Sequence, residues 1–198
     1  DSQYSITART VALQKSFTKV GGGTTYKAGD TIEYTLNFQV SDFFALSDFN
    51  VTDVLSDGQE ILPFYNPTTQ TGFTPTISFT QHATSISGSF NPANVTTTDE
   101  ANGKQTVVFK VSDQLAAIRN PSNPTDTKVL GAAIPAGGTG GPEPSPTPPP
   151  NVPGTTGTIV FRAKVLNNSR VTPTAGAAVV QGDRMTDVAH LSSEVLAY

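Results

Sequence analysis

The chain has 198 residues, a net charge of −4, only 14% charged residues and no cysteine. Without cysteine there are no disulfides and no thiolate metal sites, and the scattered Lys and Arg provide neither a basic stripe for nucleic acid nor a basic amphipathic helix for a membrane surface. We therefore expect no nucleic-acid partner, no membrane insertion by this segment and no cofactor. The many Thr, Ser, Gly and Pro residues favour strands and turns, as in an exported all-β protein.

The first patterned segment, residues 11–17, places a lysine among apolar side chains. Successive side chains of a strand point to opposite faces, so Lys15 shares a face with Val11, Leu13 and Phe17. Leaving an ammonium unpaired in apolar surroundings is costly, and the group would sooner lose its proton, meet a carboxylate or react. The rest of the chain should therefore supply a partner for Lys15.

The next two strands predicted from the sequence are 31–40 and 49–55. Residues 31–40 alternate without a break, with apolar side chains at every even position. In 49–55, Asp53 lies on the same face as its apolar neighbours two positions away, Val51 and Leu55. A second ionisable residue is thus aimed at the core.

The middle of the chain has shorter elements and a long Pro/Gly-rich stretch. We expect a turn at 99–103 and one or two helical turns at 114–119. Residues 121–157 are dominated by Pro, Gly, Ser and Thr, which do not sustain a regular hydrogen-bonded ladder, so we interpret this segment as a loop insertion. Short strands are expected at 76–81, 85–90 and 105–111.

The closing strand repeats the irregularity of the first. Within 184–195, Asp187 is in phase with the apolar residues Met185, Ala189 and Leu191. A lysine and two aspartates from three separate strands therefore each interrupt an apolar face. Local violations of this kind tend to mark a functional site.

The segments after the insertion also decide the domain organisation. The strands expected there, at 158–166, 177–180 and 184–195, are too short to fold alone and must complete a sheet begun earlier. We therefore interpret residues 1–198 as one domain, an all-β, immunoglobulin-like β-sandwich with a long Pro/Gly-rich insertion at 121–157. Residues 1–10, which are polar and weakly patterned, are expected to be a lead-in or an edge strand.

Two interpretations of Lys15, Asp53 and Asp187 remain open. In one, the lysine is held between two carboxylates in a buried ionic network that helps to fix strand register. In the other, Lys15 and Asp187 are covalently joined and Asp53 is the catalyst. An apolar pocket favours uncharged amines and carboxyl groups, so the amine can attack the Asp187 carbonyl while Asp53 polarises that carbonyl and relays protons.

A family resemblance supports the covalent interpretation. Lys15, followed by KAGDTIEYTL at 27–36, NVTDVL at 50–55 and MTDVA at 185–189, resembles the isopeptide-forming immunoglobulin-like domains of bacterial adhesins and pilins. It is most similar to the collagen-adhesin A-type fold and to conserved surface-repeat domains, over roughly residues 11–62 and 155–196.

The resemblance implies roles for three residues. In that family a lysine of the first strand bonds to an asparagine of the last strand, assisted by an acid on a central strand. These roles fall on Lys15, Asp187 and Asp53. This chain departs from the pattern because it has Asp187 where the family usually has asparagine, so the reaction would release water instead of ammonia.

The resemblance also implies a function. We expect a structural domain of a bacterial cell-surface adhesin or fibre, extracellular, joined to neighbouring domains of the same protein and acting on no substrate other than itself. The alternative is an adhesin domain that binds a glycan or host protein and keeps an unreacted Lys/Asp network. Five aromatic residues could line a binding patch for that ligand: Phe43, Phe44, Phe64, Tyr65 and Phe73.

Metal chemistry and turnover catalysis have little support in the sequence. His82 and His190 are isolated, and His190 lies on the polar phase of its strand, so we expect no metal site. The stretch 99–103 lacks the spaced acidic ligands of a calcium loop and is better explained as a turn. A turnover enzyme would need a cleft that exposes Asp53 to solvent.

Overall fold

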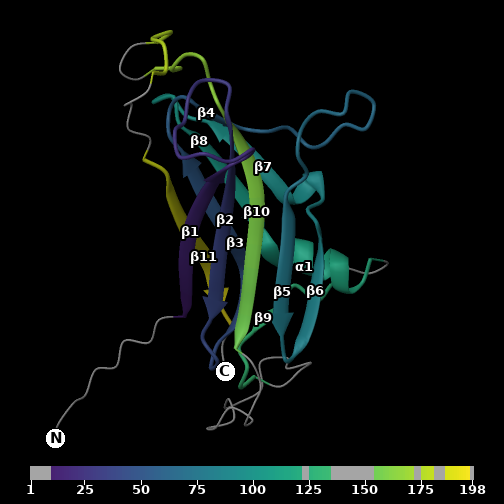
Figure 1. Cartoon of the computed structure of the whole chain (residues 1–198). Helices are drawn as coiled ribbons and strands as arrows, with labels where there is room; N and C mark the ends of the chain where they lie inside the picture. Colours follow the sequence, from purple (N-terminus) through teal and green to yellow (C-terminus); the bar gives the residue numbers. More distant parts are fainter. Residues whose placement is uncertain (1–9, 122–124, 135–153, 172–174, 181–185, 197–198) are drawn as a thin grey trace, which may run out of the picture.

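The computed structural model describes residues 10–121, 125–134, 154–171, 175–180 and 186–196, and these form two antiparallel sheets packed face to face (Figure 1). The first sheet contains, in spatial order, β1 (Val11–Lys19), β2 (Thr31–Val40), β10 (Thr155–Val165), β5 (Thr76–Gln81) and β6 (Thr84–Ser89), and β4 (Gln59–Ile61) also pairs with β10. The second contains β11 (Val188–Val195), β3 (Ala45–Leu55), β8 (Gln105–Lys110) and β7 (Val95–Asp99), and β9 (Val129–Leu130) also pairs with β3. The predicted all-β sandwich is confirmed.

The core lies between the inner faces of the two sheets. The alternation predicted for 31–40 is confirmed, because every even residue of β2 is buried and the odd residues are not. Aromatic rings meet across the interior: the centroids of Phe38 and Phe49 are 5.0 Å apart, and those of Phe109 and Phe161 are 5.2 Å apart. These contacts between sheets are worth more than the buried area alone.

The strand that follows the Pro/Gly-rich stretch completes the first sheet. β10 lies between β2 and β5, which both precede the Pro/Gly-rich stretch, so it completes a sheet begun earlier in the chain, as expected. It begins at Thr155, three residues earlier than predicted, and includes Gly157. A Cβ on Gly157 would lie 2.1 Å from Cζ of Phe38, so this glycine makes room for a core ring.

Part of the predicted insertion is a buried element and not a surface loop. Val129 and Leu130 form β9 against Ala45 and Leu46 of β3, and the residues that follow, up to Ile134, are buried too. The strand β3 accordingly starts at Ala45, four residues before the strand predicted at 49–55. The remainder of the insertion, 135–153, lies outside the described residues.

Other boundaries also differ from the prediction. The helix α1 (Val111–Arg119) includes Val111, which was assigned to the preceding strand. The expected strand at 177–180 is reduced, in the described part, to a single bridge between Asn168 and Ala178. Phe17, expected in the core, is 57% exposed and contacts Tyr26 and Tyr34 only at ring-to-ring distances near 6 Å. Strands β4 and β7 and the 3₁₀ turn η1 (Pro92–Asn94) were not predicted.

The helical content is low. No helix in the described ranges is long and apolar enough to cross a bilayer. Two predicted features lie outside the described residues. They are the lead-in or edge strand at 1–10, of which only residue 10 is described, and the inward position of Met185.

Candidate functional site

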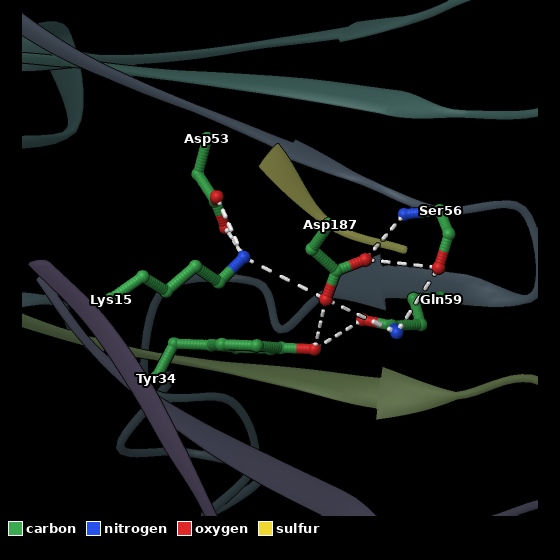
Figure 2. Close-up of polar contacts among 6 residues, drawn as sticks. All are labelled: Lys15, Tyr34, Asp53, Ser56, Gln59 and Asp187. Atoms are coloured by element: carbon green, nitrogen blue, oxygen red, sulfur yellow. Dashed lines mark hydrogen bonds and ion pairs between the residues drawn. The ribbon is translucent and has the colours of Figure 1, made fainter. Parts of the chain in front are cut away.

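The first and last strands of the described chain bring the predicted residues together. β1 and β11 are edge strands of opposite sheets, and they contact each other along one side of the sandwich (Figure 1). Lys15 projects from β1 and Asp53 from near the end of β3, whereas Asp187 is the residue just before β11. Figure 2 shows their three side chains converging between the sheets.

Asp53 and Lys15 form a close ion pair in the interior. Nζ of Lys15 lies 2.7 Å from Oδ1 and 2.8 Å from Oδ2 of Asp53, whose side chain is fully buried. Burial raises the pKa of Asp53 to about 6, although the Lys15 charge and hydrogen bond oppose this rise. Asp53 is therefore less stable as an anion than an exposed carboxylate, and its oxygens are placed to accept a proton from the Lys15 ammonium.

Asp187 lies on the other side of the same ammonium. Its Oδ2 is 3.6 Å from Nζ of Lys15, and only 10% of its side chain is exposed. Lys15 Nζ also lies 4.3 Å from the centroid of the Tyr34 ring, which forms one wall of the pocket. The amine thus faces one carboxyl group at hydrogen-bonding distance and a second within reach of a small side-chain movement.

Three polar residues that were not predicted hold Asp187. Its Oδ1 accepts hydrogen bonds from the backbone N–H of Ser56 at 2.8 Å and from the Ser56 hydroxyl at 2.9 Å. Its Oδ2 lies 2.6 Å from Oη of Tyr34 and 3.4 Å from Nε2 of Gln59. Each oxygen of the carboxyl group therefore has its own set of partners (Figure 2).

The Tyr34 hydroxyl has more short contacts than it has hydrogens. Its Oη lies 2.6 Å from Oδ2 of Asp187 and also 2.6 Å from Oε1 of Gln59. Burial, and then the Asp187 charge, raises the pKa of Tyr34, so the phenol keeps its proton. A phenol donates only one hydrogen, so Oδ2 of Asp187 and Oε1 of Gln59 are alternative acceptors for the same Tyr34 proton.

The sequence indicates the positions of these three additional residues to different extents. Tyr34 occupies an inward position of the most regular strand, but its period-2 phase says only that the ring is buried. Ser56 and Gln59 lie in and just after the turn that follows β3, where no periodicity exists to orient side chains. Their burial, at 6% and 1% exposed, was the feature that the sequence could not supply.

The remaining candidates do not form a second site. Phe43 and Phe44 follow β2, whereas Phe64, Tyr65 and Phe73 follow β4, which pairs with the opposite end of β10, so the five aromatics do not share one patch. Phe64 lines a groove of about 700 Å³ beside β4 and β7.

The histidines and the possible calcium loop have structural explanations. Nε2 of His82 lies 3.3 Å from the Gly131 carbonyl oxygen, and His190 faces outward from β11 as predicted. The predicted turn at 99–103 is confirmed by the hydrogen bond from Glu100 N–H to the Lys104 carbonyl, which closes the hairpin between β7 and β8.

Comparison with known proteins gives remote neighbours. No family model and no curated protein matches the chain. Among solved structures it is similar to two major pilins of Corynebacterium diphtheriae. For SpaA the identity is 10% and the TM-score 0.37, over 80% of this chain and 29% of that one. For SpaD the identity is 11% and the TM-score 0.38, over 93% of this chain and 35% of that one.

A third neighbour is the collagen-binding domain of the Erysipelothrix rhusiopathiae surface protein RspB, with 13% identity and a TM-score of 0.35 over 92% of this chain and 49% of that one. The chain thus spans less than half the length of each of these three chains. All three neighbours are chains of bacterial pilins or surface proteins.

Proposed function

We propose that this chain is a structural domain of a bacterial surface adhesin or fibre, and that it cross-links itself once by an amide between Nζ of Lys15 and Cγ of Asp187. The observation that supports this most is the position of Lys15 Nζ, 2.7 Å from the buried Asp53 and 3.6 Å from Asp187. An amine, an acid and a proton acceptor are thus held together in one dry pocket, which is what the reaction requires.

The proposed chemistry uses only groups of this chain. Asp53 takes a proton from the Lys15 ammonium, and the neutral amine attacks the carbonyl carbon of protonated Asp187. Water leaves and an amide remains. The product no longer contains the buried ammonium, so the desolvation cost of the ion pair disappears.

The position of the cross-link suits a load-bearing role. It would join the first strand to the residue preceding the last strand, at edges of opposite sheets. A force that pulls on the two ends of the domain would then pass through a covalent amide, and most of the chain between the two residues would be protected from extension. On this proposal the domain is extracellular, its partners are neighbouring domains of the same surface protein, and its chemistry occurs once without turnover.

Intact-mass spectrometry tests the proposal directly. The purified chain should be lighter than its sequence mass by one water, and Lys15→Ala should restore the full mass expected for that variant. Lys164→Ala is the matched control, because Lys164 faces outward from β10 and should leave the water loss unchanged. Proteolysis should yield a branched peptide that joins the segments around Lys15 and Asp187.

The opposite result would favour the ionic interpretation. Full calculated mass in the native chain, with no branched peptide, would overturn the cross-link. Lys15, Asp53 and Asp187 would then form only a buried ionic network.

A further inference from the structure

The two oxygens of Asp187 have chemically different surroundings. Oδ1 receives two hydrogen bonds, both from Ser56, whereas Oδ2 faces the Tyr34 hydroxyl and lies on the Lys15 side of the pocket (Figure 2). When an amine attacks a carboxylic acid, one oxygen becomes the negative oxygen of the tetrahedral intermediate and the other departs. The pocket therefore distinguishes the two oxygens before the reaction begins.

Ser56 has the geometry of an oxyanion hole for Oδ1. Its backbone N–H and its hydroxyl lie 2.8 Å and 2.9 Å from that oxygen, within the range in which fixed donors stabilise a developing negative charge. Ser56 is 6% exposed, so these donors act in a region with little water, where their effect is larger. Both donors already point at Oδ1 and need no rearrangement during the reaction.

Tyr34 has the geometry of an acid for Oδ2. Its Oη is 2.6 Å from Oδ2, and the Gln59 amide oxygen, also 2.6 Å away, gives its hydrogen a second acceptor while Asp187 is still the intact acid. Once Oδ2 becomes the hydroxyl of a tetrahedral intermediate it is more basic, and the phenol can turn its hydrogen from Gln59 to Oδ2. Gln59 thus acts as a positioning residue for Tyr34.

From its observed position Asp53 cannot both remove a proton from the Lys15 amine and polarise the Asp187 carbonyl. Its two oxygens face Lys15 Nζ at 2.7 Å and 2.8 Å, which suits proton removal from the amine. The sequence-based expectation also gave Asp53 the polarisation of the Asp187 carbonyl, but the groups in hydrogen-bonding contact with the Asp187 oxygens come from Ser56, Tyr34 and Gln59.

We propose that Ser56 and Tyr34 are catalytic residues of amide formation, Ser56 by stabilising the negative charge on Oδ1 and Tyr34 by protonating the departing Oδ2. This assignment rests on the proposed function, because it concerns the same reaction. It divides the work among three residues, with Asp53 on the nucleophile, Ser56 on the carbonyl oxygen and Tyr34 on the leaving group.

The steps balance without any external reagent. The Lys15 ammonium gives one proton to Asp53, and the C–N bond forms as the carbonyl π pair moves onto Oδ1. The nitrogen then releases a second proton while Tyr34 delivers its own proton to Oδ2. The C–Oδ2 bond breaks, water leaves, and the electron pair on Oδ1 restores the carbonyl. Tyr34 recovers the proton released by nitrogen, the amide keeps one hydrogen, and Asp53 stays protonated.

Timed synthesis of the full chain measures these contributions. The chain is made in a cell-free translation reaction, samples are quenched in denaturant at intervals, and the fraction that has lost water is read by intact mass. Ser56→Ala removes one oxyanion donor but keeps the backbone N–H, so we expect a slowing of about 10²-fold, and Ser56→Thr should restore the rate. Tyr34→Phe keeps the ring but removes the acid, and should slow water loss by about 10²-fold.

Two control variants separate catalysis from folding. Ser112→Ala removes another buried hydroxyl, which accepts a hydrogen bond from the Phe49 N–H at 2.9 Å outside the site. Tyr26→Phe removes a phenol whose ring packs on Phe17 and which is not among the described hydrogen-bond partners of Asp187. Both should react at the native rate. Thermal melts of all variants show whether Ser56→Ala loses more stability than Ser112→Ala. If the Ser56→Ala variant does not fold, Tyr34→Phe and Ser56→Thr still decide the assignment.

The leaving group provides a readout that a merely structural role would not change. Asp187→Asn forms the same amide but releases ammonia. Ser56 acts on the oxygen common to both reactions, so Ser56→Ala should slow both by the same factor. Tyr34 acts on the departing atom, so the factor caused by Tyr34→Phe should differ between oxygen and nitrogen.

The possible results distinguish this assignment from the proposed function. Rates within about threefold of native for both Ser56→Ala and Tyr34→Phe, in a chain that does lose water, would overturn the assignment and leave the cross-link intact. A native chain that never loses water would overturn the cross-link itself, whatever the variants do.

Discussion

Two lysines of β1 form ion pairs of the same length in different surroundings. Lys15 and Lys19 are four residues apart in β1, on the same phase of the strand, and each has a carboxylate oxygen 2.7 Å from its Nζ. The partner of Lys15 is Asp53, in the middle of the opposite sheet. The partner of Lys19 is Asp30, in the turn before β2.

The surroundings of the two carboxylates shift their pKa values in opposite directions. Asp30 also accepts the Lys27 backbone N–H at 2.8 Å, and its hydrogen bond with Lys19 lowers its pKa. Burial dominates at Asp53 and raises its pKa to about 6. A short ion pair is therefore not enough to make a reactive site, because the acceptor must also be destabilised as an anion.

The largest difference should appear when each lysine is removed. Lys15→Ala should eliminate the cross-link, and because its two ends lie roughly 170 residues apart, the free energy of unfolding should fall by about 5 kcal/mol from loop entropy alone. Lys19→Ala should keep the cross-link and most of the stability. Guanidinium titrations of both variants, with intact masses, test this contrast; equal losses of stability would contradict it.

The second-largest difference between the two ion pairs should appear when the charge of each carboxylate is removed. Asp53→Asn keeps the shape of the side chain but cannot take the proton of Lys15, so water loss should slow by roughly 10²- to 10⁴-fold. Asp30→Asn should react at the native rate. Timed intact-mass measurements give both rates, and fast water loss in Asp53→Asn would require another base for Lys15.

The opposite pKa shifts predict opposite effects of pH on stability. In an Asp187→Ala background, which cannot cross-link, Asp53 binds its proton more tightly in the folded than in the unfolded state. The free energy of unfolding should therefore fall as pH rises from about 4 to about 6, by no more than about 3 kcal/mol. Asp30 has a lowered folded pKa, so its contribution is present above its unfolded pKa and is lost on acidification.

Urea titrations across this pH range separate the two groups. Adding Asp53→Asn to the Asp187→Ala background should remove the fall in stability between about pH 4 and 6, whereas adding Asp30→Asn should leave it. If the free energy of unfolding still falls without the Asp53 carboxyl group, a different group causes this pH dependence.

The inward positions of Lys15 and Asp53 follow from strand periodicity, and Asp187, one residue before β11, keeps the phase of that strand. Lys15, Asp53 and Asp187 each occupy a position two residues from apolar neighbours, and period 2 holds wherever a strand has one buried face. Lys19 was missed because the predicted strand ended at Phe17, although the same phase continues to the true end of β1.

Periodicity gives no information where the chain turns or where an element is very short. Ser56 and Gln59 are oriented by the turn after β3 and by the pairing of β4 with β10, which are long-range features. β9 has two residues, too few to show a period, and its position in a Pro/Gly-rich stretch concealed it. β7 has the sequence VTTTD, in which Val95 is the only buried residue, so no apolar alternation marks it as a strand.

The smallest effect should come from the coupling within the Lys19 pair. Lys19 also donates to the Thr25 carbonyl at 2.9 Å, so its position does not depend on Asp30 alone. A double-mutant cycle of Lys19→Met and Asp30→Asn should therefore give a small coupling energy that decreases further with added salt, as for other pairs near the surface. Urea titrations of the four proteins measure it. A large coupling energy that added salt does not reduce would mean that the Lys19 pair is as isolated from solvent as the Lys15 pair. Burial would then no longer explain why Lys15, and not Lys19, is placed to react.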